Sequence, residues 1–266
     1  MEQVEIVHGD TGAIPFGMGT YGSRSASVGG TAILMSLNKI KEKGRRIAAH
    51  LLEASPNDIE YVKGQFQVKG VPSKAVPFGA VSLTAYVPHK YPDNLEPGLE
   101  ETSFYDPSNF CFPFGAHACV VEVDRDTGTV KILRYVAVDD VGKVINPMIV
   151  DGMVHGGIAQ GVGQALWEGA VYDEGSGQLV TGSMMDYALP KADMLPLYET
   201  DRTVTPTPVN PMGIKGAGET GTIAATPTVV NAVIDALAPL GVDHIEAMPL
   251  TSERVWKAIQ AAKAKR

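Results

Sequence analysis

The placement of glycine restricts the fold of this chain more than any other feature. Of its 266 residues, 29 are glycine, and residues 17–22 and 216–221 both spell G-x-G-x-x-G. Glycine lets the backbone come close to a bulky group. In a dinucleotide-binding fold, this pattern follows a buried parallel strand and precedes, by ~20 residues, an acidic residue at the end of a second strand. Here loop-like residues precede the first segment and a proline-rich stretch precedes the second, so an NAD-dependent dehydrogenase is the least favoured interpretation.

Charge and hydropathy exclude several further classes of protein. The chain has 22 Lys and Arg against 30 Asp and Glu, a formal net charge of −8, and no basic stripe. Nucleic acids attract cationic surfaces, so we expect no nucleic-acid partner. No stretch reaches the ~18 apolar residues of a membrane span, and the N-terminus lacks the features of a secretory signal. We therefore expect a cytoplasmic protein without a membrane span.

The two cysteines, Cys111 and Cys119, are too few for an iron–sulfur cluster and match no zinc-binding spacing. We expect both to be buried, reduced thiols.

Hydrophobic periodicity predicts an α+β fold with mostly antiparallel sheets. Helices are predicted over residues 27–52, 78–87, 153–167, 226–237 and 252–263, with Gly44 as a candidate break in the first. Strands are predicted over residues 4–7, 59–62, 65–69, 117–124, 129–138 and 178–186. Residues 88–109 and 203–213 are expected to be irregular. The chain is expected to form two lobes, residues 1–110 and 111–266.

Three polar groups could carry chemistry, and each has a structural alternative. Glu219 lies between glycines, so its carboxylate could reach into a cavity as a general base; the alternative is a carboxylate that interacts with a helix dipole. Residues 23–25 precede a long helix whose N–H groups attract anions, so they could bind a phosphate. The alternative is that Ser25 or Ser27 caps the helix. Gln160 and Gln164 share one helix face with glycines, which suits either a ligand or helix packing. From pattern alone, the structural alternatives are favoured.

Six segments, taken in order along the chain, resemble segments of one protein family. They are residues 9–11, 19–25, 113–117, 145–148, 155–161 and 215–219, which read GDT, GTYGSRS, PFGAH, INPM, HGGIAQG and KGAGE. Together they resemble the C-terminal molybdopterin-binding region of the xanthine dehydrogenase/aldehyde oxidase family of molybdenum hydroxylases. The resemblance is nearest to the carbon monoxide dehydrogenase large-subunit branch.

The resemblance implies a role for each segment. It makes Glu219 the active-site glutamate beside molybdenum and places Gln160 near the pterin. It places Asp140 and Asn146 at the cytosine end of molybdopterin cytosine dinucleotide. The remaining cofactor-binding residues that it implies are Thr20, Tyr21, Gly22, Ser23, Arg24, Ser25, Lys215 and Gly218. Two positions depart from the family: Met153 stands where Gln is frequent and Val141 where Cys is frequent. Either departure could alter a polar contact near the cofactor.

The resemblance also implies an enzyme larger than this chain. Large subunits of the family are far longer, so we expect a fragment or one product of a split large subunit, inactive alone. The expected partners are the N-terminal half of the large subunit, an iron–sulfur (2Fe-2S) small subunit and an FAD medium subunit. Copper would enter only through a residue outside this chain. The expected activity is oxidative hydroxylation of carbon monoxide, an aldehyde or an N-heterocycle; the alternative is a cofactor-free assembly or interaction domain.

Overall fold

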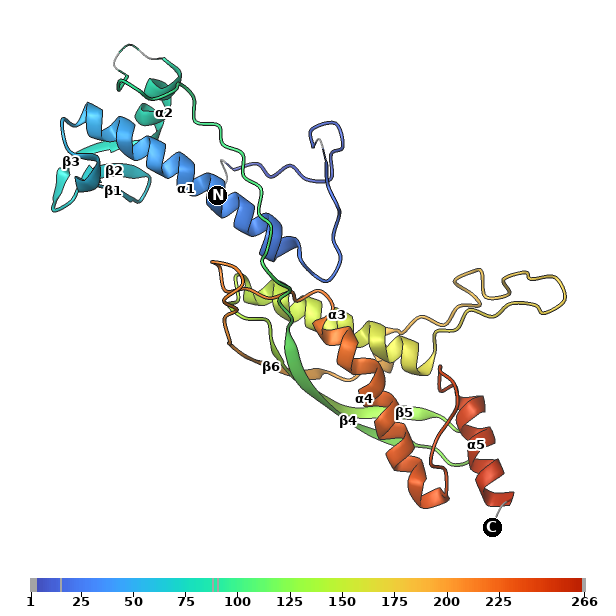
Figure 1. Cartoon of the computed structure of the whole chain (residues 1–266). Coiled ribbons are helices and arrows are strands. Elements are labelled where there is room, and N and C mark those ends of the chain that lie inside the picture. Colours follow the sequence, from blue (N-terminus) through green and yellow to red (C-terminus); the bar gives the residue numbers. More distant parts are fainter. Residues whose placement is uncertain (1–3, 15, 88, 90, 265–266) are drawn as a thin grey trace. The chain divides into compact units, whose positions relative to one another are not determined.

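The chain divides into two compact units in a computed structural model that describes residues 4–14, 16–87, 89 and 91–264 (Figure 1). One unit comprises Val28–Ser108, and the other combines Met1–Ser27 with Asn109–Arg266. The N-terminal residues thus group with the C-terminal region, whereas the expected lobes separate them. The fold class is α+β, as predicted.

A three-stranded sheet and three helices form the larger unit. The strands are β4 (Phe114–Val123), β5 (Val130–Asp140) and β6 (Tyr198–Thr203), in the order β4-β5-β6. Strands β4 and β5 are antiparallel, which confirms the predicted hairpin, and β6 is parallel to β5. The helices are α3 (Pro147–Leu166), α4 (Thr220–Leu237) and α5 (Ser252–Ala264), and short 3₁₀ turns lie at Ala192–Met194 and Ala238–Leu240.

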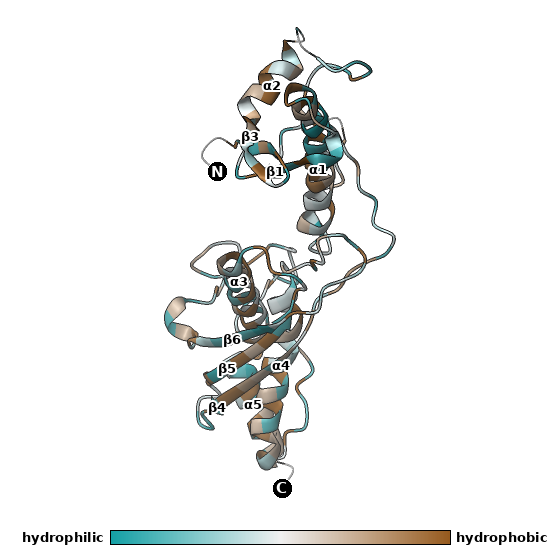
Figure 2. Ribbon diagram, turned by 90° about the vertical axis from the view of Figure 1, so that its left-hand side faces the viewer, coloured by the Kyte–Doolittle hydropathy of each residue, from teal (hydrophilic) through white to brown (hydrophobic). Residues whose placement is uncertain are grey.

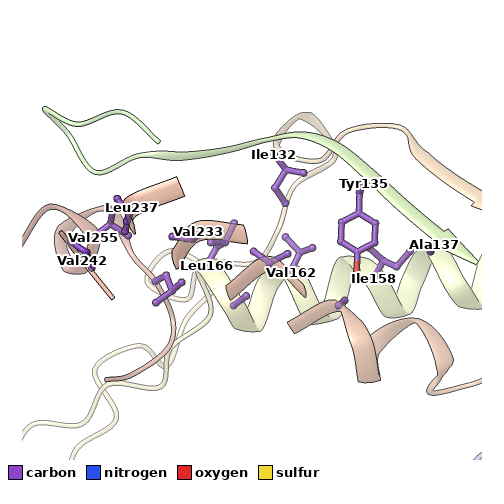
Figure 3. Packing of buried hydrophobic residues seen from close by; sticks show 14 of the residues in the cluster. Ile132, Tyr135, Ala137, Ile158, Val162, Leu166, Val233, Leu237, Val242 and Val255 are labelled. Atoms are coloured by element: carbon purple, nitrogen blue, oxygen red, sulfur yellow. The ribbon is translucent and has the colours of Figure 1, made fainter. Parts of the chain in front are cut away.

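The core of this unit lies between the sheet and the helices. Ile132, Tyr135 and Ala137 point from β5 toward side chains of α3 and α4 such as Ile158 and Val162 (Figure 3). Hydrophobic residues also run along β4 and β5 and on α4 and α5 (Figure 2). Helix α4 with the turn after it is long and apolar enough to cross a membrane by length and composition alone. Its buried residues, such as Val229 and Val233, belong to this core cluster.

The smaller unit has its own core around most of α1 (Ser25–Leu51). It contains a 3₁₀ turn (Pro56–Asp58), the antiparallel strands β1 (Ile59–Val62), β2 (Gln65–Val68) and β3 (Val71–Pro77), and α2 (Phe78–Tyr86). Helix α1 continues through Gly44, because the missing side chain leaves room for the buried Phe66 ring: a Cβ there would lie 2.6 Å from Phe66 Cζ. The expected break at Gly44 is therefore wrong, whereas the first hairpin and α2 are confirmed.

Several predicted boundaries are wrong for identifiable reasons. Helix α3 begins at Pro147 and not at residue 153, because Asn146 caps it and proline suits the first turn. Helix α4 begins at Thr220, with Pro227 inside it at the cost of one backbone hydrogen bond. The predicted strand over residues 178–186 forms only the isolated bridge Tyr172↔Leu179, since no strand lies beside it. Residues 4–7 are likewise not a strand.

Strand β6 and strand β3 were not predicted. The β6 sequence, YETDRT, is polar at every second position and half-buried at the others, so its hydrophobic signal is weak. In β3, two prolines lower the strand propensity.

Helices α3 and α4 cross with their backbones close together. A Cβ on Gly157 would lie 2.8 Å from the Thr222 nitrogen, and one on Gly221 would lie 2.3 Å from the Val154 carbonyl oxygen. The hydroxyl of Thr222 donates a hydrogen bond to the Gly157 carbonyl at 2.8 Å. The glycines that suggested close approach thus serve helix packing, and the same crossing sets the position at which α4 begins.

Because α3 and α4 cross closely, we expect alanine at two adjacent glycines to have opposite effects on the stability of the chain. Gly157→Ala should destabilise the chain by about 1–3 kcal/mol, because backbone atoms of α4 cannot move aside cheaply. Gly156→Ala is the matched control: a Cβ there would have no atom within 4 Å, so the higher helix propensity of alanine should stabilise by about 0.5–1 kcal/mol. Thermal or denaturant unfolding measures both; equal effects at the two positions would contradict the close crossing.

Candidate functional site

A cavity of about 610 Å³ opens in the larger unit, where three separate parts of the sequence meet. The first part is the glycine-rich loop with the start of α1, the second joins β5 to α3, and the third precedes α4. The lining residues are Thr20, Tyr21, Gly22, Ser23, Ser25, Ala26, Val141, Lys143, Val144, Ile145, Asn146, Ile149, Val150, Met153, Ile214, Lys215, Ala217, Gly218 and Glu219.

The glycine-rich loop is held largely by its own side chains. The hydroxyls of Thr20 and Ser25 share a hydrogen bond. The Arg24 guanidinium lies over the Tyr21 ring, 4.0 Å from the centroid, and donates to the Gly19 carbonyl at 3.2 Å. Arg24 therefore braces the loop, and among the described residues it is not one that lines the cavity.

Glu219 lines this cavity and is exposed. It occupies the N-cap position of α4, yet its side chain makes no capping hydrogen bond to the helix. The carboxylate instead accepts a hydrogen bond from Ser23 Oγ, with Oγ 2.7 Å from Oε2. The Glu219 N–H in turn donates to Ser23 Oγ at 3.1 Å. The two residues are 196 positions apart, so only the fold brings them together.

A buried ion pair anchors the segment that carries Glu219. Lys215 Nζ lies 2.9 Å from Asp140 Oδ1, and the Lys215 and Asp140 side chains are 8% and 0% exposed. The hydroxyl of Thr203 donates to the other carboxylate oxygen, and the Gly142 N–H donates to Oδ1. Lys215 also lies 4.4 Å from the centroid of the Phe114 ring.

This environment shifts the ionisation of Asp140 strongly. Burial by itself would raise the pKa of the carboxyl, but the hydrogen bonds from Lys215, the Gly142 N–H, Thr205 and Thr203 outweigh burial. The pKa of Asp140 is consequently held well below its ordinary value. Both oxygens have partners within the chain, and through this pair Asp140 holds the cavity-lining Lys215.

The structure separates the predicted site residues into two groups. Thr20, Tyr21, Gly22, Ser23, Ser25, Asn146, Lys215, Gly218 and Glu219 line the cavity; of the described residues predicted for the site, Arg24, Asp140 and Gln160 do not. Gln160 is exposed on α3, seven residues beyond Met153 and hence on the same helix face. Asn146 has a second role, because its side chain accepts a hydrogen bond from the Ile149 N–H at 3.4 Å as the cap of α3.

Sequence reasoning missed the apolar wall of the cavity. Ile149, Val150 and Met153 lie in the first two turns of α3, Ile145 precedes its cap, and Val141 follows β5. Met153 and Val141 are the two positions that depart from the family. Ile145 and Ile149 are exposed. An apolar residue before the helix cap and another in the first turn form a signal that could have indicated a contact surface.

The described residues contain no group of three or more His, Cys, Asp or Glu side chains that could hold a metal ion. Both cysteines are free, as predicted, but half-buried. Burial raises the pKa of the Cys119 thiol to about 11. His117, buried beside Tyr135 and Asp139, is a structural histidine.

The ion pair predicts a pH-dependent loss of stability. Asp140→Asn should destabilise the chain by about 3–5 kcal/mol at pH 7, because it leaves the buried amine of Lys215 without its counter-charge. The pKa of Asp140 is lower in the folded than in the unfolded chain. Its stabilisation is therefore fully present above the unfolded value of about 3.9 and is lost as the pH falls further. The difference between the two proteins in denaturant unfolding should thus shrink below about pH 4.

Glu199→Gln is the control for this prediction. It removes an ion pair with Arg134 in which both side chains are at least half exposed, so its cost should stay below about 1 kcal/mol. A similarly small loss for Asp140→Asn would show that the buried pair does not stabilise the fold.

Comparison with known proteins gives one family model and several relatives. The model described as "Molybdopterin cofactor-binding domain" matches residues 1–196. The carbon monoxide dehydrogenase large chain of Hydrogenophaga pseudoflava is 46% identical over 97% of this chain and 32% of its own length.

Two solved structures are similar to this chain over nearly its whole length. A crystal structure of a Cu,Mo-CO dehydrogenase has a TM-score of 0.86 and 43% identity, covering 95% of this chain and 31% of that one. Quinoline 2-oxidoreductase from Pseudomonas putida 86 has a TM-score of 0.85 and 42% identity, with coverages of 92% and 31%. The chain thus spans about a third of the length of the relatives that it matches.

Proposed function

Because the chain belongs to the molybdopterin cofactor-binding domain family, we propose that it forms part of a molybdenum cofactor site and supplies Glu219 as the general base. The observation that carries this proposal is the position of Glu219. Glu219 lines the cavity, its carboxylate does not cap α4, and the carboxylate accepts a hydrogen bond from Ser23.

The cavity fits an extended, anionic cofactor. Hydroxyl groups of Thr20, Tyr21, Ser23 and Ser25 lie along one part of it, at the start of α1. The first turn of a helix carries unpaired N–H groups and partial positive charge, which favour phosphate. The apolar wall from Ile145 to Met153 suits the flat face of a ring system. In this proposal Thr20 and Ser25 contact the phosphates of molybdopterin cytosine dinucleotide, and Asn146 contacts its far end.

When bound, the cofactor would supply the redox chemistry that removes two electrons from the substrate. The part of this chain is to hold the cofactor and to move one proton. An exposed carboxylate that lines a pocket can accept a proton from a group placed within hydrogen-bonding distance. The adjacent glycine, Gly218, leaves room for the Ser23 hydroxyl and the Met153 side chain, because a Cβ there would lie 3.1 Å and 3.2 Å from them. Arg24 stabilises the glycine-rich loop by its hydrogen bond to the Gly19 carbonyl. Asp140 holds Lys215 by the ion pair, and Lys215 begins the segment that leads to Glu219.

The whole protein would be an oxidoreductase of the type named among the relatives, acting in the cytoplasm. Its substrate would be carbon monoxide, an aldehyde or an N-heterocycle. An iron–sulfur subunit and an FAD subunit would carry the electrons away, and copper, if used, would be held outside this chain. Gln160 would contact the pterin from α3, the face that it shares with Met153.

Glu219→Gln tests the proposal. Gln keeps the shape of the side chain but cannot take up a proton, so kcat of the complete enzyme that contains this chain should fall by about 10²–10⁴. Molybdenum content and melting temperature should change little, because the carboxylate caps nothing. Normal turnover with a lowered melting temperature would contradict the catalytic role and support the helix-dipole alternative.

A second test concerns the chain by itself. Because it matches about a third of its relatives' length, we expect the purified chain to hold less than one molybdenum per molecule and to lack activity. Elemental analysis decides this. A full complement of molybdenum would show that this chain alone makes the site. Absence of molybdenum from the complete protein as well would favour a cofactor-free assembly domain.

A further inference from the structure

We propose that Ser23 is a positioning residue for Glu219: it holds carboxylate oxygen Oε2 so that the other oxygen, Oε1, is the one that takes the proton. This inference rests on the proposed role of Glu219 as a base. It assigns to Ser23 a function different from the phosphate contact that its place in the glycine-rich loop suggests.

Two hydrogen bonds join the Ser23 hydroxyl to Glu219, and they use its single donor proton. Oγ donates its single proton to Oε2 at 2.7 Å and accepts the Glu219 N–H at 3.1 Å. The serine thereby connects the carboxylate of Glu219 to the backbone of the same residue, which limits rotation about the bonds between them. Because the proton is used, the Ser23 hydroxyl cannot also donate to a phosphate in this arrangement. The hydroxyls of Thr20 and Ser25 share one hydrogen bond, so one of their two protons remains for that purpose.

The other carboxylate oxygen is left free. Within the described part of the chain, Oε1 accepts no hydrogen bond, although Glu219 lines the cavity. A carboxylate with one oxygen anchored and the other open presents a single, oriented acceptor to a group in the cavity. General bases act efficiently when they are held within hydrogen-bonding distance of the proton that they abstract.

Packing fixes the serine as firmly as its hydrogen bonds do. Ser23 has a positive φ of 54°, a conformation that places it in the left-handed region. The glycines before Glu219 lie directly against it: a Cβ on Gly216 would be 2.5 Å from Ser23 Cβ, and one on Gly218 would be 3.1 Å from Oγ. The second G-x-G-x-x-G segment therefore has glycine at these two positions because the serine occupies the space.

Two variants remove the hydroxyl in different ways. Ser23→Ala keeps Cβ, whereas Ser23→Gly also suits the positive φ and introduces no backbone strain. In the complete enzyme, both should lower kcat by about 10- to 100-fold while KM changes less than about threefold, since misplacement of a base affects the chemical step. Ser73→Ala, at an exposed position in β3 of the other unit, should leave both constants unchanged.

A second readout does not depend on activity. In this chain, hydrogen–deuterium exchange at the Glu219 amide should become faster in both Ser23 variants, because its acceptor is removed, and should be unchanged in Ser73→Ala. Molybdenum content of the complete enzyme should stay at the wild-type level.

The outcomes separate this inference from the function on which it rests. If Glu219→Gln abolishes turnover while both Ser23 variants keep kcat within twofold, Glu219 is the base and the positioning role of Ser23 is wrong. If molybdenum content falls in parallel with kcat, Ser23 binds the cofactor and the inference is overturned. If Glu219→Gln turns over normally, the proposed function itself fails, whatever the exchange data show. Slower turnover at constant molybdenum with faster amide exchange supports the proposal.

Discussion

The buried pair of Asp140 and Lys215 is the interaction on which the site depends. Asp140 ends β5, and Lys215 begins the segment that leads to Glu219 and α4. The Lys215 N–H donates to the Val141 carbonyl at 2.8 Å, and Gly142 pairs with Ile214 in a short bridge. Charge and backbone contacts together attach the Glu219 segment to the end of the sheet. A buried ion pair costs desolvation energy, but it fixes geometry when the carboxylate oxygens have further hydrogen bonds, as those of Asp140 do here.

Glycine has two different roles around this anchor. At the crossing of α3 and α4, Gly157 and Gly221 allow two helix backbones to touch, which places the first turn of α4 beside α3. Ahead of α4, Gly216 and Gly218 leave room for Ser23. Both roles depend on the missing Cβ. Neither is the role that the G-x-G-x-x-G pattern has in a dinucleotide-binding fold with a parallel sheet. Within the described residues, both glycine-rich segments lead into helices and neither directly follows a strand.

The cavity combines these features with an apolar wall. Hydroxyls at the start of α1 and a carboxylate at the start of α4 face side chains from the start of α3. Three helix starts thus contribute to one cavity, with partial positive charge from their first turns. An anionic group with a flat ring would be stabilised by such surroundings, which is the physical basis of the proposed cofactor site.

The sequence by itself determined the fold class, the two hairpins, α2 and α5, because local hydrophobic periodicity decides these elements. It also singled out Glu219 and the loop before α1, since a carboxylate between glycines and serines before a long helix are local patterns. The start of α4 escaped prediction because the contact with α3 overrides the local preference of Pro227. Strand β6 exists only because β5 offers a paired edge to a polar segment.

Only the tertiary structure decided what the singled-out residues do. Asp140 pairs with Lys215, 75 positions away, and Ser23 with Glu219, 196 positions away. The periodicity of a sequence does not indicate hydrogen bonds across such separations, because these bonds depend on the path of the whole chain. The sequence therefore identified which groups could act, whereas the fold determined that Asp140 pairs with the cavity-lining Lys215 and that Glu219 lines the cavity.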